Sequence, residues 1–228
     1  MKTLFLLITM PLIFINFYGQ NLNTNSQTMF VNEYYKHFDE CRLPFSTQKV
    51  DMDYDSYNKL HNRIPKEVIL KYIGNSKVDI GYDYFNTNPD THEESSGFAE
   101  FYYYYLYRFK NSNNFFTLYI KLQGPDSTLI YIASYNQDGK NIDKLKLHGF
   151  INDTEFMKSV IISDFKIMVF KYEPIENFKK TKITVYNYEI NNSGKFELIN
   201  IESKEGKHHF TDYRDSYKNP DDDPINQY

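Results

Sequence analysis

The chain has 228 residues, a formal net charge of −4 and an aromatic content of 18%, with 22 Tyr, 19 Phe and no Trp. Its weak acidity argues against a nucleic-acid surface, because such a surface needs clustered positive charge to displace counterions from phosphates. Its single cysteine, Cys41, excludes an internal disulfide, so the fold must be stable without cross-links.

The first 19 residues have the pattern of a signal peptide. Lys2 gives a positive start, residues 4–17 are almost wholly apolar, and polar residues follow Gln20. The apolar run is shorter than the ~20 residues that a membrane-spanning helix needs, and no second run of that length follows. We therefore expect export, cleavage next to Gly19 or Gln20, and no membrane span in the processed chain. An uncleaved membrane anchor is the alternative.

Two short amphipathic helices are predicted before the β-rich part. Aromatic residues recur at helical spacing over residues 30–38. A second helix is predicted over residues 64–74, where Pro65 suits the first turn and Gly74 suits the end. One further turn, capped by Asp53 or Asp55, is expected before it. The buried side of the second helix is predicted to carry Val68, Ile69, Tyr72 and Ile73.

Residues 75–97 are rich in Asn, Asp, Ser, Thr and Gly, and they predict a loop with one short strand over Val78–Tyr84. From Phe98 onward, apolar and polar residues alternate in segments separated by turn residues every eight to twelve positions. In the first segment the odd positions from Phe101 to Phe109 are all aromatic, so its odd face is the expected core. The predicted strands are Phe98–Phe109, Phe115–Leu122, Thr128–Tyr135, Ile142–Leu147, Met157–Ser163, Lys166–Tyr172, Lys182–Ile190 and Phe196–Ile201.

This spacing predicts a mainly β fold with a minor α component, in which an antiparallel meander forms a curved sheet, a sandwich or a barrel. About 200 residues suit one domain, which we place at 20–203, between the signal peptide (1–19) and a polar tail (204–228). The tail is expected to be disordered, because it has little apolar surface to bury.

Two stretches are alike, residues 135–140 and residues 190–195, and both centre on Asn with Gly. An internal duplication would explain them. Two ordinary hairpin tips would also explain them, because tight hairpins favour the same residues for the same backbone reason.

The chain has none of the short motifs of serine hydrolases, zinc proteases, redox dithiols or phosphate-binding loops. One acidic cluster, His92-Glu93-Glu94 with Asp83 and Asp90, offers metal-ligand types but lacks calcium-loop spacing, which favours a solvated loop. We therefore expect no metal and no cofactor, and no catalytic residue is assigned. A thiol nucleophile at Cys41 is the alternative to an inert cysteine.

A second cluster lies in the polar tail: Lys207-His208-His209 with Asp212 and Asp215. Adjacent histidines on a strand face opposite ways, so they do not bind one ion easily. We interpret this cluster as part of a polar tail.

The tyrosine run from Tyr102 to Tyr105 has two interpretations. Tyr102 and Tyr104 would form an aromatic stripe in contact with water that stacks on a sugar or holds a peptide. Alternatively, the same rings are cross-strand partners that stabilise the sheet.

The apolar start that ends in Phe17-Tyr18-Gly19-Gln20 resembles the export signals of Gram-negative envelope proteins. The Leu43-Pro44-Phe45 segment, the Ile64-Pro65-Lys66-Glu67 helix start and the Asp138-Gly139-Lys140 turn resemble small periplasmic or lipoprotein-like proteins of such bacteria that have no assigned activity. This chain differs from the lipoproteins, because Cys41 lies too far beyond the apolar run to carry a lipid. The resemblance implies no catalytic residue.

The function expected is that of an exported, non-catalytic envelope or secreted protein that binds another macromolecule through its sheet or an edge strand. The partner would be another envelope protein or a glycan, and not nucleic acid. A secreted hydrolase that uses loop carboxylates or a metal is the alternative. An inhibitor or immunity protein would share the same binding physics.

Overall fold

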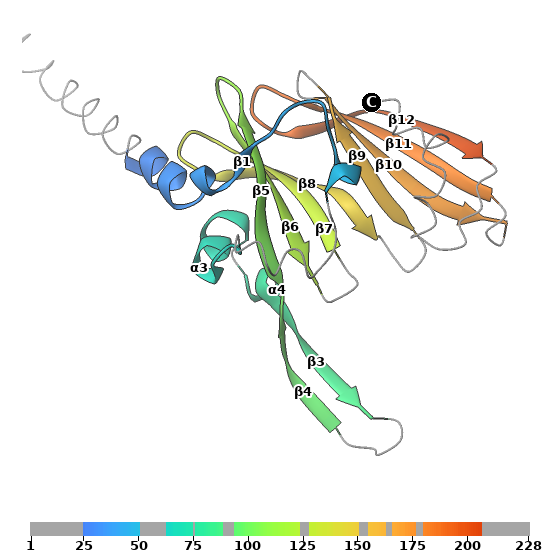
Figure 1. Cartoon of the computed structure of the whole chain (residues 1–228), viewed down its shortest axis with the longest axis horizontal. Coiled ribbons are helices and arrows are strands. Elements are labelled where there is room, and N and C mark those ends of the chain that lie inside the picture. The colour runs from blue at the N-terminus through green and yellow to red at the C-terminus, as the bar shows by residue number, and fades with distance from the viewer. Residues whose placement is uncertain are drawn as a thin grey trace, which may run out of the picture.

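The computed structural model (Figure 1) describes residues 25–50, 63–74, 76–88, 94–123, 128–150, 155–162, 166–176 and 180–206. The expected signal peptide, the turn expected after Asp53 or Asp55, and the chain after Gly206 lie outside these residues. The described part is mostly β, as the alternation predicts, with one ten-stranded sheet, a separate two-stranded sheet and a few short helices.

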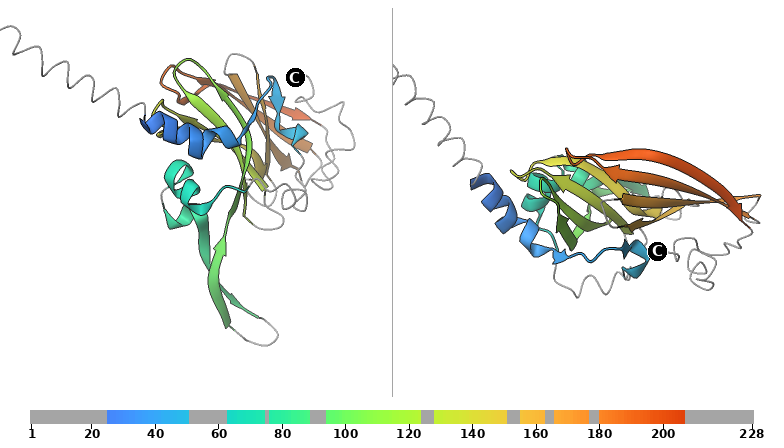
Figure 2. Two further views of the ribbon diagram at one scale, coloured as in Figure 1. Left: turned by 60° about the vertical axis from the view of Figure 1, so that its left-hand side comes forward. Right: turned by 90° about the horizontal axis from the view of Figure 1, so that it is seen from above.

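The first described segment is helical over residues 25–33 and continues into a 3-10 turn, η1 (Tyr35–His37). Phe30, Tyr34 and Phe38 face the sheet, and each is at most 2% exposed. Figure 2 shows this segment, in blue, against the green strands of the large sheet. The short amphipathic helix predicted over residues 30–38 is therefore confirmed in substance, although it begins earlier.

The second predicted helix consists of a helical turn, α3 (Lys66–Val68), that continues into a π-helical turn, η3 (Ile69–Ile73). Pro65 precedes it, where a missing N–H leaves no hydrogen bond unmade. Of the predicted apolar side, Ile69, Tyr72 and Ile73 are buried, and Val68 is partly buried against the same cluster.

Gly74 ends this helix for a steric reason. A Cβ on Gly74 would lie 2.3 Å from Cγ of Asp79, so the close approach of the next helix, α4 (Lys77–Ile80), requires glycine there. Asp79 is held in place by a capping box with Ser76, whose side-chain oxygen lies 2.7 Å from Oδ2 of Asp79.

A hairpin follows α4 where a loop with one short strand was predicted over residues 75–97. The short strand predicted over Val78–Tyr84 is confirmed from Gly81 onward, whereas the loop predicted after it is wrong for Glu94–Gly97. β3 (Gly81–Thr87) pairs antiparallel with β4 (Glu94–Glu100) in the separate two-stranded sheet. We call this hairpin the arm, and Figure 1 shows it projecting from the body of the protein. Ser95, Ser96 and Gly97 are poor strand formers, and they are extended here through pairing with β3.

The single strand predicted over Phe98–Phe109 is divided at Phe101. Its first residues belong to β4 of the arm, whereas β5 (Tyr102–Lys110) belongs to the large sheet. The pairing of β5 with its neighbour shifts register between Tyr105 and Tyr107, so Leu106 interrupts the simple alternation of faces.

The large sheet is a meander with the order β1-β5-β6-β7-β8-β9-β10-β11-β12, and β2 pairs with β9 beside this path. Neighbouring strands from β5 to β12 are antiparallel, whereas β1 runs parallel to β5. The order is open, with β1 and β12 at its ends, so of the predicted forms a curved open sheet is the one adopted. The remaining strands are β1 (Asp39–Glu40), β2 (Phe45–Ser46), β6 (Phe115–Leu122), β7 (Thr128–Tyr135), β8 (Asn141–Phe150), β9 (Phe156–Ile161), β10 (Lys166–Ile175), β11 (Lys180–Ile190) and β12 (Phe196–Gly206).

The two similar stretches form hairpin tips with matching hydrogen bonds. Oδ1 of Asn136 accepts from the backbone N–H of Lys140 at 2.9 Å, and Oδ1 of Asn191 accepts from that of Lys195 at 3.0 Å. Gly139 and Gly194 adopt φ values of 78° and 86°, which side chains disfavour. The shared residues therefore follow from turn chemistry, and no duplication is needed to explain them.

The curved sheet (Figure 2) carries buried clusters on both faces. Side chains at even positions of β6, with Ile167 and Val169 of β10, belong to one of these clusters. On the opposite face of β5–β7, Phe30, Tyr34 and Tyr72 of the helical segments pack against Phe115, Tyr119 and Tyr135. Both faces of β5 and β6 therefore contribute to the core. The odd face expected as core in β5 does carry the buried Tyr103, but Tyr104 on the other face is buried as well.

The last strand is longer than predicted. β12 ends at Gly206, not Ile201, and its residues Glu202–Gly206 pair with β11 through Val185–Thr181. Residues 204–206, assigned above to the polar tail, are therefore part of the sheet. Ladder hydrogen bonds with β11 order this polar segment although it buries little apolar surface.

Candidate functional site

The predicted acidic cluster is only partly within the described residues. Asp83 lies on β3 and accepts from Nζ of Lys77 at 2.8 Å through both carboxylate oxygens, and its side chain is largely exposed. Glu94 begins β4, whereas Asp90, His92 and Glu93 lie outside the described residues. Over the part of the chain that the structure describes, no group of three or more His, Cys, Asp and Glu side chains converges to hold a metal ion. The tail cluster of Lys207, His208, His209, Asp212 and Asp215 also lies outside the described residues.

The tyrosine run is mainly structural. Tyr103 and Tyr104 are 2% and 4% exposed, on opposite faces of β5. Tyr102 is half-buried, with the guanidinium of Arg63 4.1 Å from its ring centroid. The stripe in contact with water predicted from Tyr102 and Tyr104 is therefore wrong for Tyr104, because segments on both sides cover this part of the sheet.

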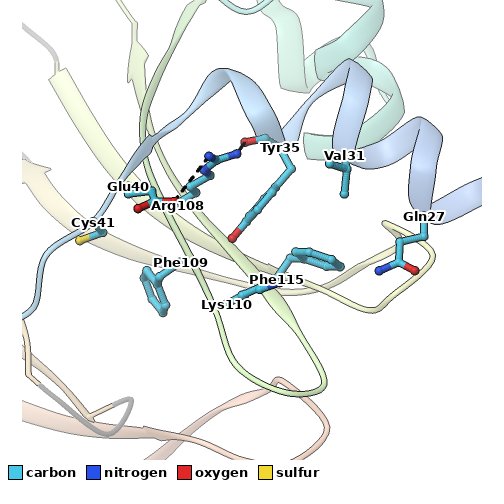
Figure 3. Close-up of a pocket in the computed structure, with 9 residues that line it drawn as sticks. All are labelled: Gln27, Val31, Tyr35, Glu40, Cys41, Arg108, Phe109, Lys110 and Phe115. Carbon is cyan, nitrogen blue, oxygen red and sulfur yellow. Dashed lines mark hydrogen bonds and ion pairs between the residues drawn. The ribbon is translucent and has the colours of Figure 1, made fainter.

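Cys41 lies beside a hollow of about 470 Å³ between the N-terminal helical segment and the end of the β5–β6 hairpin (Figure 3). Burial raises the pKa of its thiol to about 11, so the thiol is protonated at neutral pH and is a poor nucleophile. This supports the interpretation of Cys41 as inert. The hollow is lined by Gln27, Val31, Tyr35, Glu40, Cys41, Arg108, Phe109, Lys110 and Phe115.

Arg108 is the best-placed cation at this hollow, and its bonds are to the protein itself. Its guanidinium donates to the backbone oxygen of Tyr35 at 3.3 Å and lies 3.9 Å from a carboxylate oxygen of Glu40 (Figure 3). The backbone oxygen of Arg108 accepts from the N–H of Cys41 at 2.8 Å. These contacts stabilise the packing of η1 and β1 against β5, so Arg108 has a structural role.

The other candidate is β12, an edge strand of 11 residues that pairs with β11 on one side. Its centre is apolar and open to solvent: Leu198, Ile199 and Ile201 are 46%, 56% and 52% exposed. An edge strand has backbone N–H and C=O groups directed away from its neighbour, and these can pair with another strand. Among the residues that the structure describes, no strand pairs with the outer side of β12, which therefore combines an edge backbone with exposed aliphatic side chains.

The opposite edge of the sheet is partly blocked. β1 pairs with β5 at Tyr107 and Arg108, and Arg63 forms an isolated bridge with Tyr104. The N–H of Ile64 donates to the backbone oxygen of Tyr103 at 2.7 Å. Short segments thus occupy much of the outer side of β5.

The exposed side chains of β12 continue the core. Leu198 pairs with Tyr188 and Ile201 with Tyr186 across the ladder, so each pair shares a face. Tyr186 and Tyr188 pack against the buried cluster that contains Ile167 and Val169. The apolar layer of that cluster therefore extends to the edge of the sheet, where Leu198 and Ile201 are uncovered.

The tip of the β11–β12 hairpin is fixed to the rest of the sheet. The N–H of Phe196 donates to Oδ2 of Asp143 at 3.0 Å, and Nδ2 of Asn114 donates to the backbone oxygen of Asn192 at 3.4 Å. These hydrogen bonds hold the first residues of β12 against the rest of the sheet. Sequence alone predicts β12 as a strand but not as an edge, because strand order depends on pairing that the alternation does not encode.

No helix of the described residues has the length and apolarity to cross a bilayer. The described geometry thus offers a strand edge with exposed aliphatic side chains and an open hollow. A comparison of the chain with protein-family models, curated proteins and solved structures finds no match.

Proposed function

We propose that this protein is an exported, non-catalytic binding protein whose partner adds an extended polypeptide segment to β12. The observation that carries the proposal is the open 11-residue edge with Leu198, Ile199 and Ile201 exposed at its centre. The proposed export depends on the signal-like pattern of residues 1–19.

Strand addition explains why such an edge would persist. Soluble proteins usually protect edge strands with central charges, proline or short length, because exposed edges aggregate. The charged residues Glu197, Glu202, Lys204 and Glu205 of β12 leave an uncharged segment, Leu198–Ile201, between the first two of them. In strand addition the main chain supplies affinity, and alternate side chains supply specificity.

The test compares two double variants. Leu198→Lys with Ile201→Lys places charges at the centre of the edge, and Val78→Lys with Phe85→Lys is the matched control on α4 and the arm, where the wild-type residues are 74% and 68% exposed. Each protein is used as bait in the exported-protein fraction, and any recovered polypeptide is purified and recombined with it. We expect the complex to form with the wild type and the control but not with the edge variant, and partner binding should slow amide exchange in β12.

The proposal would be contradicted if the edge variant bound the purified partner as tightly as the wild type. It would also be contradicted if partner binding protected amides elsewhere and left β12 unchanged. Circular dichroism of each variant establishes that the substitutions leave the fold intact.

A further inference from the structure

The hollow between the N-terminal helical segment and the end of the β5–β6 hairpin has the size and lining of a small-molecule site. Its volume of about 470 Å³ lies within the roughly 300–1,000 Å³ that ligand pockets occupy. Such pockets combine apolar walls with a few polar groups that fix the orientation of the ligand. Here Val31, Phe109 and Phe115 supply apolar walls, and Tyr35 and Lys110 supply polar groups (Figure 3).

The hydroxyl group of Tyr35 is directed into this hollow. The residue is only 7% exposed, and Figure 3 shows its phenol extending from η1 toward the β5–β6 hairpin. Among the residues described, none forms a hydrogen bond with this hydroxyl. Burial raises the pKa of Tyr35 to about 12, so the phenol keeps its proton at neutral pH. Tyr35 therefore offers a hydrogen-bond donor that no described residue uses.

The charges around the hollow favour an anion. Its charged lining residues are Arg108, Lys110 and Glu40, which together carry one net positive charge. Glu40 is the only acid among them, and its side chain is 87% exposed and 3.9 Å from the guanidinium of Arg108. Lys110 is exposed, and in the described part of the chain no carboxylate forms an ion pair with it.

The cation lies beside aromatic surface. Lys110 is directly opposite Phe115 in the β5–β6 ladder, so the two side chains share a face of the sheet. The ring of Tyr35 packs against that of Phe115 on the same face, with centroids 4.8 Å apart. A ligand held by Lys110 and the Tyr35 hydroxyl would therefore place its apolar part against rings.

We propose that this hollow binds a small aromatic carboxylate. The carboxylate accepts a hydrogen bond from the hydroxyl of Tyr35 and pairs with the ammonium group of Lys110. The aromatic part packs against Val31 and Phe115, and a single negative charge balances the net charge of the lining. This site is separate from β12, and the proposal goes beyond the binding of a polypeptide there.

The test titrates the full chain with phenylpropionate and with phenylpropanol, which has the same ring and chain but no charge. Tyr35→Phe removes only the hydroxyl, and Lys110→Gln removes the ammonium group. Lys144→Gln is the matched control. Lys144 is also an exposed lysine beside a ring, since its Nζ lies 5.7 Å from the ring centroid of Tyr131, but it is on β8 and does not line the hollow.

Calorimetry should show saturable binding of phenylpropionate to the wild type and, equally tightly, to Lys144→Gln. We expect Tyr35→Phe and Lys110→Gln each to bind it about ten-fold or more weakly, because each loses a hydrogen bond to a charged group. Phenylpropanol should bind the wild type weakly by a similar factor. Phenylpropionate should also shift the NMR signals of the Val31 methyl groups, and circular dichroism establishes that each variant is folded.

The proposal would be overturned if the wild type showed no saturable binding of phenylpropionate at millimolar concentration. Equal affinities of the wild type, Tyr35→Phe and Lys110→Gln would place the binding outside this hollow and would refute it as well. If phenylpropanol bound as tightly as phenylpropionate, the site would not recognise a carboxylate.

Discussion

His148 on β8 is buried among cations and rings. Its Nδ1 lies 3.4 Å from Oγ1 of Thr47, and its ring meets the edge of Phe156 at 5.2 Å between centroids. Because Thr47 already donates its hydroxyl proton to the backbone oxygen of Ser159, His148 Nδ1 is the donor in this contact. Burial, with smaller contributions from the charges of Lys158 and Lys146, lowers the pKa of His148 to about 3.

This low pKa predicts acid sensitivity. The pKa of His148 is 6.5 when unperturbed and lower in the folded protein, so its contribution to stability is complete above pH 6.5 and is lost as the pH falls toward 3. From pH 7 to pH 5 the loss should be about 2 kcal/mol. Urea unfolding of the wild type and of His148→Asn at both pH values measures this loss of unfolding free energy. If the unfolding free energies of the two proteins changed equally between pH 7 and pH 5, the loss would not come from His148.

The two positive-φ turn glycines, Gly139 and Gly194, differ in what surrounds them. A Cβ on Gly139 would lie 2.3 Å from Cγ of Phe30, in the packed N-terminal segment, whereas a Cβ on Gly194 would meet the flexible end of Ile142 at 2.8 Å. Gly139→Ala therefore has two costs: alanine must adopt an unfavourable positive φ, and the ring of Phe30 must move. Gly194→Ala has mainly the cost of the unfavourable φ.

We expect Gly139→Ala to lower the free energy of unfolding by about 2–4 kcal/mol, and Gly194→Ala by about 1–2 kcal/mol. Chemical denaturation of the two variants measures the difference. Equal costs would show that Phe30 does not pack on this turn as the structure has it.

Among the elements, the arm has little packing against the rest of the protein. Most side chains of β3 and β4 are exposed, and a two-stranded hairpin is only marginally stable by itself in water. The arm is joined to the body near Gly81, whose missing Cβ lets the backbone oxygen of Ala99 approach to 2.2 Å of the Cβ position.

Among the described strands, β3 and β4 should therefore be the first that a protease cuts. Brief digestion with chymotrypsin, followed by mass spectrometry, should detect cleavage after Tyr82, Tyr84, Phe85 or Phe98 before cleavage after any aromatic residue of β5–β8. The reverse order would indicate that the arm is better ordered than its exposure implies.

A comparison of predicted and observed strands shows which strand bounds the sequence determines locally. β6 and β7 have the predicted bounds, because each is a clean alternation between strong turns. The alternation does not predict the first half of β4, because Ser95, Ser96 and Gly97 are poor strand formers, and it ends β12 too early, because the last residues of that strand are polar. In both cases pairing with a neighbouring strand decides the conformation, and a one-dimensional pattern does not contain it.

For the molecule as a whole, the sequence predicts the class and the meander but not the candidate surface. Alternation in β5 predicts one buried face, and the structure buries both, because the helical segments cover the face that carries Tyr103. The strand order and the segments packed against the sheet decide which strand has exposed apolar side chains. The sequence encodes neither of them locally, so it does not predict that Leu198 and Ile201 are exposed.

The central claim is that β12 is an open edge to which a further strand is added. Residue-resolved amide hydrogen exchange along β12, of the full chain alone and then with its purified partner, tests it most directly. In the chain alone, amides directed toward β11 should exchange slowly and those directed outward fast, in an alternation broken near Ile199, where the register shifts. When the partner is bound, the fast set should become protected. Uniformly slow exchange along all of β12 in the chain alone would contradict the claim, because it would show that this edge is already covered within a single chain.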